Sequence, residues 1–157
     1  MKARMVFASA FVTLLSSLAW SQQPASASNS TSADTKSQAT VYVYRYKQFV
    51  GKALSPSVYC DENELARMEN GRYFVVTLPA GPHVFRSNDK QAGVNLDVKS
   101  GEKYYIRVEI AAGFMKGHGR LVSVAPEQGS YEIKNLKPLD GDKVKDTEHV
   151  SVAEIAN

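Results

Sequence analysis

The sequence predicts an all-β protein: a small antiparallel β-sandwich of about seven to eight strands. Apolar residues alternate with polar ones at a period of two rather than at the helical period. Turn-forming residues separate these alternating segments at intervals of roughly 10–20 residues, as sandwiches of short strands require. The alternation is confined to residues 40–139, about a hundred of the 157 residues, which is enough for one hydrophobic core.

Four longer segments carry the alternation, and they are residues 40–46, 73–78, 94–98 and 104–110. In the second of these both faces are apolar, which favours a central place in a sheet. The first is also two-faced, with Tyr42, Tyr44 and Tyr46 sharing one side. The shorter strand candidates are residues 57–60, 83–87, 120–124 and 131–133. Residues 62–68 have a composition that allows a helical turn, but their position favours one arm of a hairpin.

Three breaks punctuate these strands. Asn70-Gly71 predicts a tight turn because both residue types tolerate positive φ. Pro79-Ala80-Gly81-Pro82 and Ser100-Gly101-Glu102 interrupt the chain between further pairs of strands.

Residues 1–21 have the organisation of a cleavable signal peptide. Lys2 and Arg4 form a short positive region, an uncharged segment follows, and Ala19-Trp20-Ser21 resembles a signal peptidase site. The uncharged segment is shorter than the roughly 20 apolar residues of a membrane span, and it contains several hydroxyl side chains. We therefore expect export with cleavage near Ser21, to the periplasm or out of the cell, and no stable membrane insertion of the mature protein.

The segments that flank the predicted domain lack a strand pattern. Residues 22–39 are rich in Ser, Ala, Gln and Thr, which predicts a flexible linker. Residues 140–157 are charged and weakly patterned, and they are expected to form a disordered tail.

Net charge argues against nucleic-acid binding. The whole chain carries 19 basic and 16 acidic residues, a net charge of +3, but Lys2 and Arg4 belong to the signal peptide. The mature chain would keep 17 basic residues against 16 acidic ones, a net charge of +1. No cluster of Lys and Arg remains that could neutralise several phosphates together.

Cys60 is the one cysteine of the sequence. It is too far from the predicted cleavage site to carry a lipid, and a single thiol forms no internal disulfide. At the end of the strand 57–60 it is expected to be a small buried apolar side chain rather than a nucleophile.

Three stretches give the chain a family resemblance. They are Val58-Tyr59-Cys60-Asp61, the run Gly71 to His83 that contains Leu78-Pro79-Ala80-Gly81-Pro82, and Gly101 to Arg107. With Val41 to Arg45 before them, they resemble the bacterial family called domain of unknown function 2846 (DUF2846). The Leu-Pro-x-Gly-x-His turn also resembles PEGA-type surface domains. The resemblance implies a prealbumin-like or immunoglobulin-like sandwich in the cell envelope, and it implies no activity. Many members of the family look like lipoproteins, and this chain differs in lacking a lipid-bearing cysteine.

The histidines His83, His118 and His149 are the natural candidates for chemistry. No two of them lie closer than about thirty residues, and no second cysteine helps, so we predict no metal site and no cofactor. The sequence contains no Gly-x-Ser-x-Gly nucleophile elbow, and we predict no catalytic residues. Gly117-His118-Gly119 is expected to lie in a flexible hairpin loop.

Arg45 and Arg107 each interrupt an apolar strand. They are expected to lie on a solvent face or to pair with an acid such as Glu109.

The prediction for function is an exported, non-catalytic β-sandwich that acts as a binding or structural module of the cell envelope or outside the cell. Outward-facing tyrosines suggest that its partner is an envelope protein or a polysaccharide. The alternative is a small exported hydrolase that uses His83 or His118 with a nearby acid.

Overall fold

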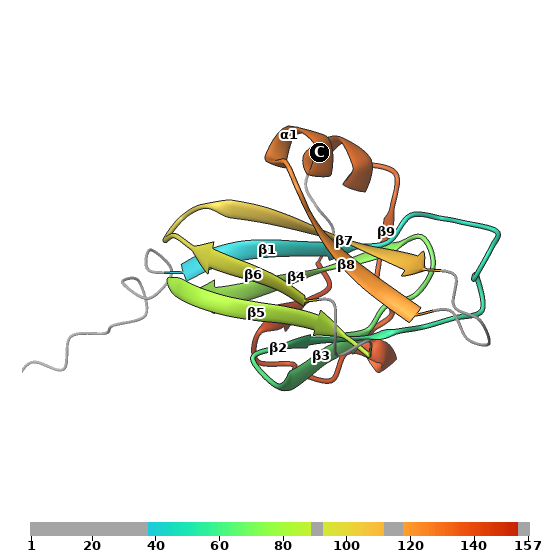
Figure 1. The fold of residues 1–157 in the computed structure, drawn as a ribbon, viewed down its shortest axis with the longest axis horizontal. Coiled ribbons are helices and arrows are strands. Elements are labelled where there is room, and N and C mark those ends of the chain that lie inside the picture. Colours follow the sequence, from blue (N-terminus) through green and yellow to red (C-terminus); the bar gives the residue numbers. More distant parts are fainter. Residues whose placement is uncertain (1–37, 89–92, 112–117, 154–157) are drawn as a thin grey trace, which may run out of the picture.

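We analysed a computed structural model of the chain, which describes residues 38–88, 93–111 and 118–153. The predicted signal peptide, and the predicted linker apart from Gln38 and Ala39, lie outside the described residues. The described chain forms two sheets packed face to face, with one α-helix on the outer side of the larger sheet (Figure 1). This confirms the all-β sandwich that the alternating pattern predicts.

The larger sheet has the strand order β10-β4-β1-β7-β8, and β9 pairs with β4 outside this path. Its strands are β1 (Gln38–Tyr44), β4 (Arg72–Pro79), β7 (Lys103–Ala111), β8 (His118–Val124), β9 (Lys137–Pro138) and β10 (Val150–Ser151). The pairs β1–β7 and β4–β9 are parallel, and the others are antiparallel. The two segments with two apolar faces became β1 and β4, which both have neighbours on each side.

The smaller sheet has the order β3-β2-β5-β6. Its strands are β2 (Ser57–Cys60), β3 (Asn63–Arg67), β5 (Gly81–Ser87) and β6 (Gly93–Val98). β3 pairs antiparallel with β2, so residues 62–68 do supply a hairpin arm. Asp61 and Glu62 form the hairpin turn, with φ values of 46° and 77°. Positive φ at both central positions defines a type I′ turn, a conformation that Glu adopts rarely.

The breaks seen in the sequence carry the chain from one sheet to the other. The turn at Asn70-Gly71 joins β3 to β4, the turn at Ala80 joins β4 to β5, and the turn at Ser100-Gly101 joins β6 to β7. In each case the two strands belong to different sheets. An immunoglobulin sandwich keeps its first two strands in one sheet. Here β1 and β2 lie in different sheets, which differs from that arrangement.

The core fills the space between the sheets. Its fully buried members include one residue from each of β1, β2, β4, β5 and β7, namely Val41, Val58, Phe74, Phe85 and Ile106. These are the inward positions of the period-two pattern, and alternate residues point to the opposite face.

One predicted strand is wrong. Residues 131–133 belong to α1 (Pro126–Ile133), which covers the outer face of the larger sheet beside β7 (Figure 1). Pro126 stands at the first helical position, where a proline costs no hydrogen bond. The helix is short, and apolar packing on the sheet stabilises it more than its own propensity does.

Two further boundaries differ from the sequence-based expectation. β1 begins at Gln38, and Ala39 is fully buried, so the predicted linker overlaps the first strand. Residues 140–153 are not a disordered tail: a 3₁₀ turn, η3 (Gly141–Lys143), leads to a bridge between Val144 and Ala66, and β10 then pairs with β4. The weak pattern is explained by these short pairings, which need few apolar residues.

Candidate functional site

A small hollow of about 150 Å³ gathers most of the chemically versatile side chains of the described chain. It lies where the β2–β3 turn meets β5 and the C-terminal segment. Its lining includes Cys60, Asp61, His83, Asp146 and His149. The spacing of these residues in the sequence gives no reason to group them.

His83 is held by hydrogen bonds at both ring nitrogens. Its Nε2 donates to the carbonyl of Pro79 at 2.9 Å, and Nδ1 lies 2.5 Å from Asp61 Oδ2. Burial opposes a charged ring, but the Asp61 and Pro79 contacts outweigh it and raise the pKa of His83. The pKa of Asp61 is lowered: its burial is outweighed by hydrogen bonds from the Val84 amide and from His83. Both pKa shifts favour an ion pair between His83 and Asp61, which links β5 to the β2–β3 turn.

Cys60 is a buried thiol next to this pair. It is 3% exposed, and its Sγ donates to Asp61 Oδ2 at 3.6 Å. Burial, with the negative charge of Asp61 beside it, raises the pKa of the Cys60 thiol to about 12. The expectation of a buried cysteine is confirmed, and the protonated thiol is a poor nucleophile.

The other two histidines are placed differently from one another. His118 is the first residue of β8 and pairs with Ala111 of β7. The prediction that it lies in a hairpin loop is therefore wrong. Gly117 lies outside the described residues. Gly119 is buried in the same strand, where a Cβ would come within 2.3 Å of Ser87 Oγ. His149 Nδ1 is 2.9 Å from Asp146 Oδ2 at the edge of the hollow.

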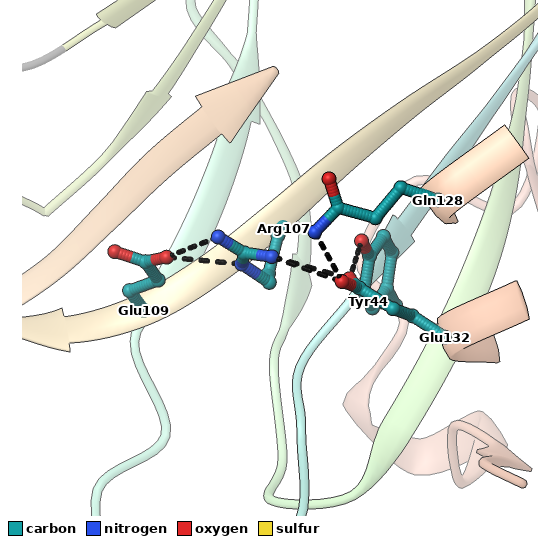
Figure 2. Close-up of polar contacts among 5 residues, drawn as sticks. All are labelled: Tyr44, Arg107, Glu109, Gln128 and Glu132. Atoms are coloured by element: carbon teal, nitrogen blue, oxygen red, sulfur yellow. Dashed lines mark hydrogen bonds and ion pairs between the residues drawn. The ribbon is translucent and has the colours of Figure 1, made fainter. Parts of the chain in front are cut away.

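A second polar cluster joins α1 to the larger sheet. Glu132 accepts hydrogen bonds from Tyr44, from Arg107 at 3.2 Å and from Gln128 at 2.6 Å (Figure 2). Arg107 also pairs with Glu109 at 2.7 Å, the acid that the sequence analysis named for it. Burial alone would raise the pKa of Glu132, but the donors around it, Tyr44 first, hold that pKa below its ordinary value. Tyr44 and Arg107 of the sheet both donate to Glu132 of the helix, and we interpret the cluster as the anchor of α1.

The tyrosines do not form an open recognition face. Tyr44, Tyr73 and Tyr105 are buried with Ile133 beneath α1, and Tyr42 stacks on Tyr105 with ring centroids 5.0 Å apart. Of the eight tyrosines, Tyr131 alone is exposed, at 73%. The expectation of an outward tyrosine surface is wrong, because the chain covers that face with its own helix.

Arg45 is fully buried rather than on a solvent face, which corrects the prediction for it. Its guanidinium donates to the carbonyls of Leu54 at 2.5 Å and Gly51 at 2.8 Å. It thereby orders the connection between β1 and β2, residues 47–54, which we call the Phe49 loop. Asn70 adds hydrogen bonds to both the amide and the carbonyl of Gln48.

The Phe49 loop carries the most exposed large apolar side chains of the described residues. Phe49 is 94% exposed and Val50 is 80% exposed. An ordered loop that presents an aromatic side chain to solvent is typical of recognition sites.

A wider hollow of about 430 Å³ lies on the smaller sheet. Tyr59, Glu62, Arg86, Ser87 and Asn88 line it. Glu62 and Arg86 form an ion pair with each other, so neither of these two charges is left unpaired in the hollow.

In the part of the chain that the structure describes, no helix has the length and apolar character of a membrane span. The fold and its clusters define a β-sandwich domain with one packed outer helix and an exposed apolar loop held by Arg45.

The comparisons with known proteins assign the chain to a family. Residues 35–120 match the family described as "Protein of unknown function (DUF2846)", and the chain belongs to that family. It is similar to an uncharacterized protein of Haemophilus influenzae, with 30% identity over 103 residues. That match covers 64% of this chain and 61% of the Haemophilus protein, so it spans less than two thirds of the relative's length. No solved structure matches.

Proposed function

We propose that the protein is an exported, non-catalytic binding module of the cell envelope that engages a partner protein through the Phe49 loop. The observation that carries the proposal is the pair Phe49 and Val50, exposed at the tip of a loop held by the buried Arg45. Exposed adjacent apolar side chains on a well-ordered support lose little entropy on binding. The signal peptide pattern of residues 1–21 supports the location.

The shape of the loop favours a protein over a polysaccharide as the partner. Phe49 and Val50 project from a connection between strands, so their complement must be concave and apolar. Pockets of that kind occur on proteins. Polysaccharides need an array of hydrogen-bonding groups around the aromatic ring, and Val50 occupies the position next to it.

A hydrolase centred on His83 is the weaker alternative. Asp61 does lie beside His83, as that alternative requires, but the Pro79 carbonyl occupies Nε2, the nitrogen that would have to activate a nucleophile. The alternative predicts an ester- or amide-cleaving activity that His83→Ala abolishes. We expect no such activity in the mature chain or in the variant.

The binding proposal is tested by photo-crosslinking from within the native envelope. A photoreactive residue at position 50 is expected to give one adduct, while the same residue at the exposed position 131 gives none. The protein identified from the adduct is then purified and titrated against the mature chain. Phe49→Ser should weaken this binding at least tenfold without lowering the unfolding temperature, because the side chain is solvent-exposed.

Other results would overturn the proposal. One is equal crosslinking from positions 50 and 131, or a purified partner that binds Phe49→Ser as tightly as it binds the wild type. Another is cosedimentation with peptidoglycan or with anionic vesicles that depends on Phe49 while no protein adduct forms. That outcome would assign the loop to a polysaccharide or to a lipid surface.

A further inference from the structure

Three different metal-binding side chains meet in the small hollow beside the β2–β3 turn. The ligand atoms of Cys60, Asp61 and His83 all lie within 4.8 Å of one another. A thiolate, an imidazole and a carboxylate together are the donor set of borderline-soft divalent cations, above all Zn²⁺. These residues come from β2, its turn and β5, so the paired strands hold them in place.

The orientation of His83 is the second argument. The Pro79 carbonyl can only accept, so Nε2 carries a proton, and a ring nitrogen of His faces Asp61 Oδ2 across 2.5 Å. At 2.5 Å a proton bridges Nδ1 and the carboxylate. A Zn²⁺ ion, with bonds of about 2.0–2.2 Å to each ligand atom, replaces that proton when the two groups move apart. Metal-ligating histidines almost always donate their other N–H to a backbone carbonyl or carboxylate, which is the arrangement seen here.

The C-terminal segment places a further nitrogen donor at the hollow, outside the group of three ligand atoms that lie within 4.8 Å of one another. His149 lines the same hollow, and its Nδ1 contact with Asp146 fixes the ring orientation. Asp146 is itself held by the amides of Glu148 and His149. A carboxylate that orients a histidine is the usual outer support of a zinc ligand.

We propose that Cys60, Asp61, His83 and His149 form a structural Zn²⁺ site, with Asp146 orienting His149. Zn²⁺ binds Nδ1 of His83, the Asp61 carboxylate and Sγ of Cys60. The proton shared by His83 and Asp61 and the thiol proton of Cys60 are released to solvent. Four protein ligands close the coordination shell, as in structural rather than catalytic zinc sites. The ion then ties the segment that follows η3 to the smaller sheet. This site is separate from the Phe49 loop, and the proposal does not depend on the proposed function.

The test uses the mature chain without a polyhistidine tag, stripped with a chelator and titrated with Zn²⁺ by calorimetry. We expect one Zn²⁺ per chain with a Kd below about 1 µM, and a higher unfolding temperature when Zn²⁺ is bound. With Co²⁺ as a spectroscopic probe, a thiolate-to-metal charge-transfer band should appear and saturate at one equivalent. Cys60→Ser should remove that band. Cys60→Ser, His83→Gln and His149→Gln should each weaken Zn²⁺ binding at least tenfold.

Two controls separate ligation from folding. Glu148→Gln alters a neighbour of His149 that does not line the hollow, and Phe49→Ser alters the distant loop; both should bind Zn²⁺ like the wild type. Circular dichroism of each metal-free variant reports whether it is folded. The proposal is overturned if the folded wild type shows no saturable one-to-one binding. It is also overturned if Cys60→Ser retains the affinity, or if His149→Gln binds as tightly as the wild type.

Discussion

At several positions of this protein, one close contact determines which residue type the structure can accommodate. Gly129 is an example: it is buried in α1, and an added Cβ would come within 2.3 Å of Tyr105 Cγ. The helix can reach the sheet only because that side chain is absent. Arg45 is another, since its buried guanidinium holds two carbonyls of the Phe49 loop.

We predict that Gly129→Ala destabilises the protein by about 1–3 kcal/mol, the range of overpacked core positions. In an isolated helix the same change would be stabilising by up to about 1 kcal/mol, so the sign of the effect identifies the clash. Denaturant unfolding measures it. Tyr131→Ala, at an exposed position of the same helix, is the control and should change the stability by less than about 0.5 kcal/mol. A stabilised Gly129→Ala would contradict the close packing of α1 on Tyr105.

We predict that Arg45→Met loosens the Phe49 loop. Methionine fills much of the same space but donates no hydrogen bond, so the carbonyls of Gly51 and Leu54 lose their partner. Hydrogen exchange at the amides of Lys52 and Leu54, which bond within the loop, should become at least tenfold faster. Exchange in β4 serves as the internal reference. Unchanged exchange in the loop would mean that the carbonyl contacts do not order it.

At the scale of elements, α1 is held by a cluster of polar groups as well as by apolar packing. The Glu132 side chain is only 8% exposed and receives its donors from β1, from β7 and from its own helix. Its pKa lies below the ordinary value of 4.5, because the donors stabilise the carboxylate more than burial destabilises it. A carboxylate with a lowered pKa contributes stability above its unfolded-state pKa and loses it as the pH falls through the folded-state pKa.

The prediction is that Glu132→Gln costs about 1–3 kcal/mol at pH 7, because buried donors lose a charged acceptor. The difference from the wild type should shrink as the pH falls below the ordinary Glu pKa of 4.5 and through the lowered pKa of the folded protein, where the wild-type carboxylate becomes protonated. Unfolding curves across that pH range test it. Glu127→Gln, exposed on the same helix, should show neither effect. A penalty that stays constant down to pH 2 would rule out the charge of Glu132 as its cause.

At the scale of the whole molecule, the C-terminal segment closes the sandwich. Val144 bridges to β3 of the smaller sheet, and β10 then pairs with β4 of the larger one. Val150 and Val152 pack against the shared core. This segment therefore connects both sheets and covers an edge that β4 would otherwise expose.

A chain that ends at Lys143 should lose about 2–4 kcal/mol of stability, on the scale of two or three partly buried valines. It should also aggregate more readily, because the edge of β4 becomes available for pairing. Denaturant unfolding and light scattering measure the two effects. A chain that ends at Ala153 is the control and should match the full mature chain. Equal stability of both truncations would support the disordered tail that the sequence suggests.

Much of the fold could be predicted from the sequence because a half-buried strand requires apolar and polar residues to alternate along the chain. The alternation in residues 94–98 and 104–110 gave β6 and β7, and the double-faced segments gave β1 and β4. The turn at Asn70-Gly71 was placed correctly, although the sequence does not say that the chain changes sheet there. Residues 131–133 misled the prediction because three residues, Tyr131-Glu132-Ile133, are too few to distinguish a strand from a helix. In the structure the helix packs on the sheet through Gly129 and Tyr105.

What the sequence determined by itself is therefore the class of the molecule: an all-β domain of about a hundred residues in the DUF2846 family, with a signal-peptide pattern ahead of it. Local periodicity and turn chemistry suffice for that. The tertiary structure alone brought Cys60, Asp61, His83 and His149 to one hollow, buried the tyrosines under α1, and made Arg45 the support of an exposed apolar loop. The reason is physical: Asp61 and His83 lie 22 positions apart and Tyr44 and Glu132 lie 88 positions apart, and no local pattern records which strands will become neighbours.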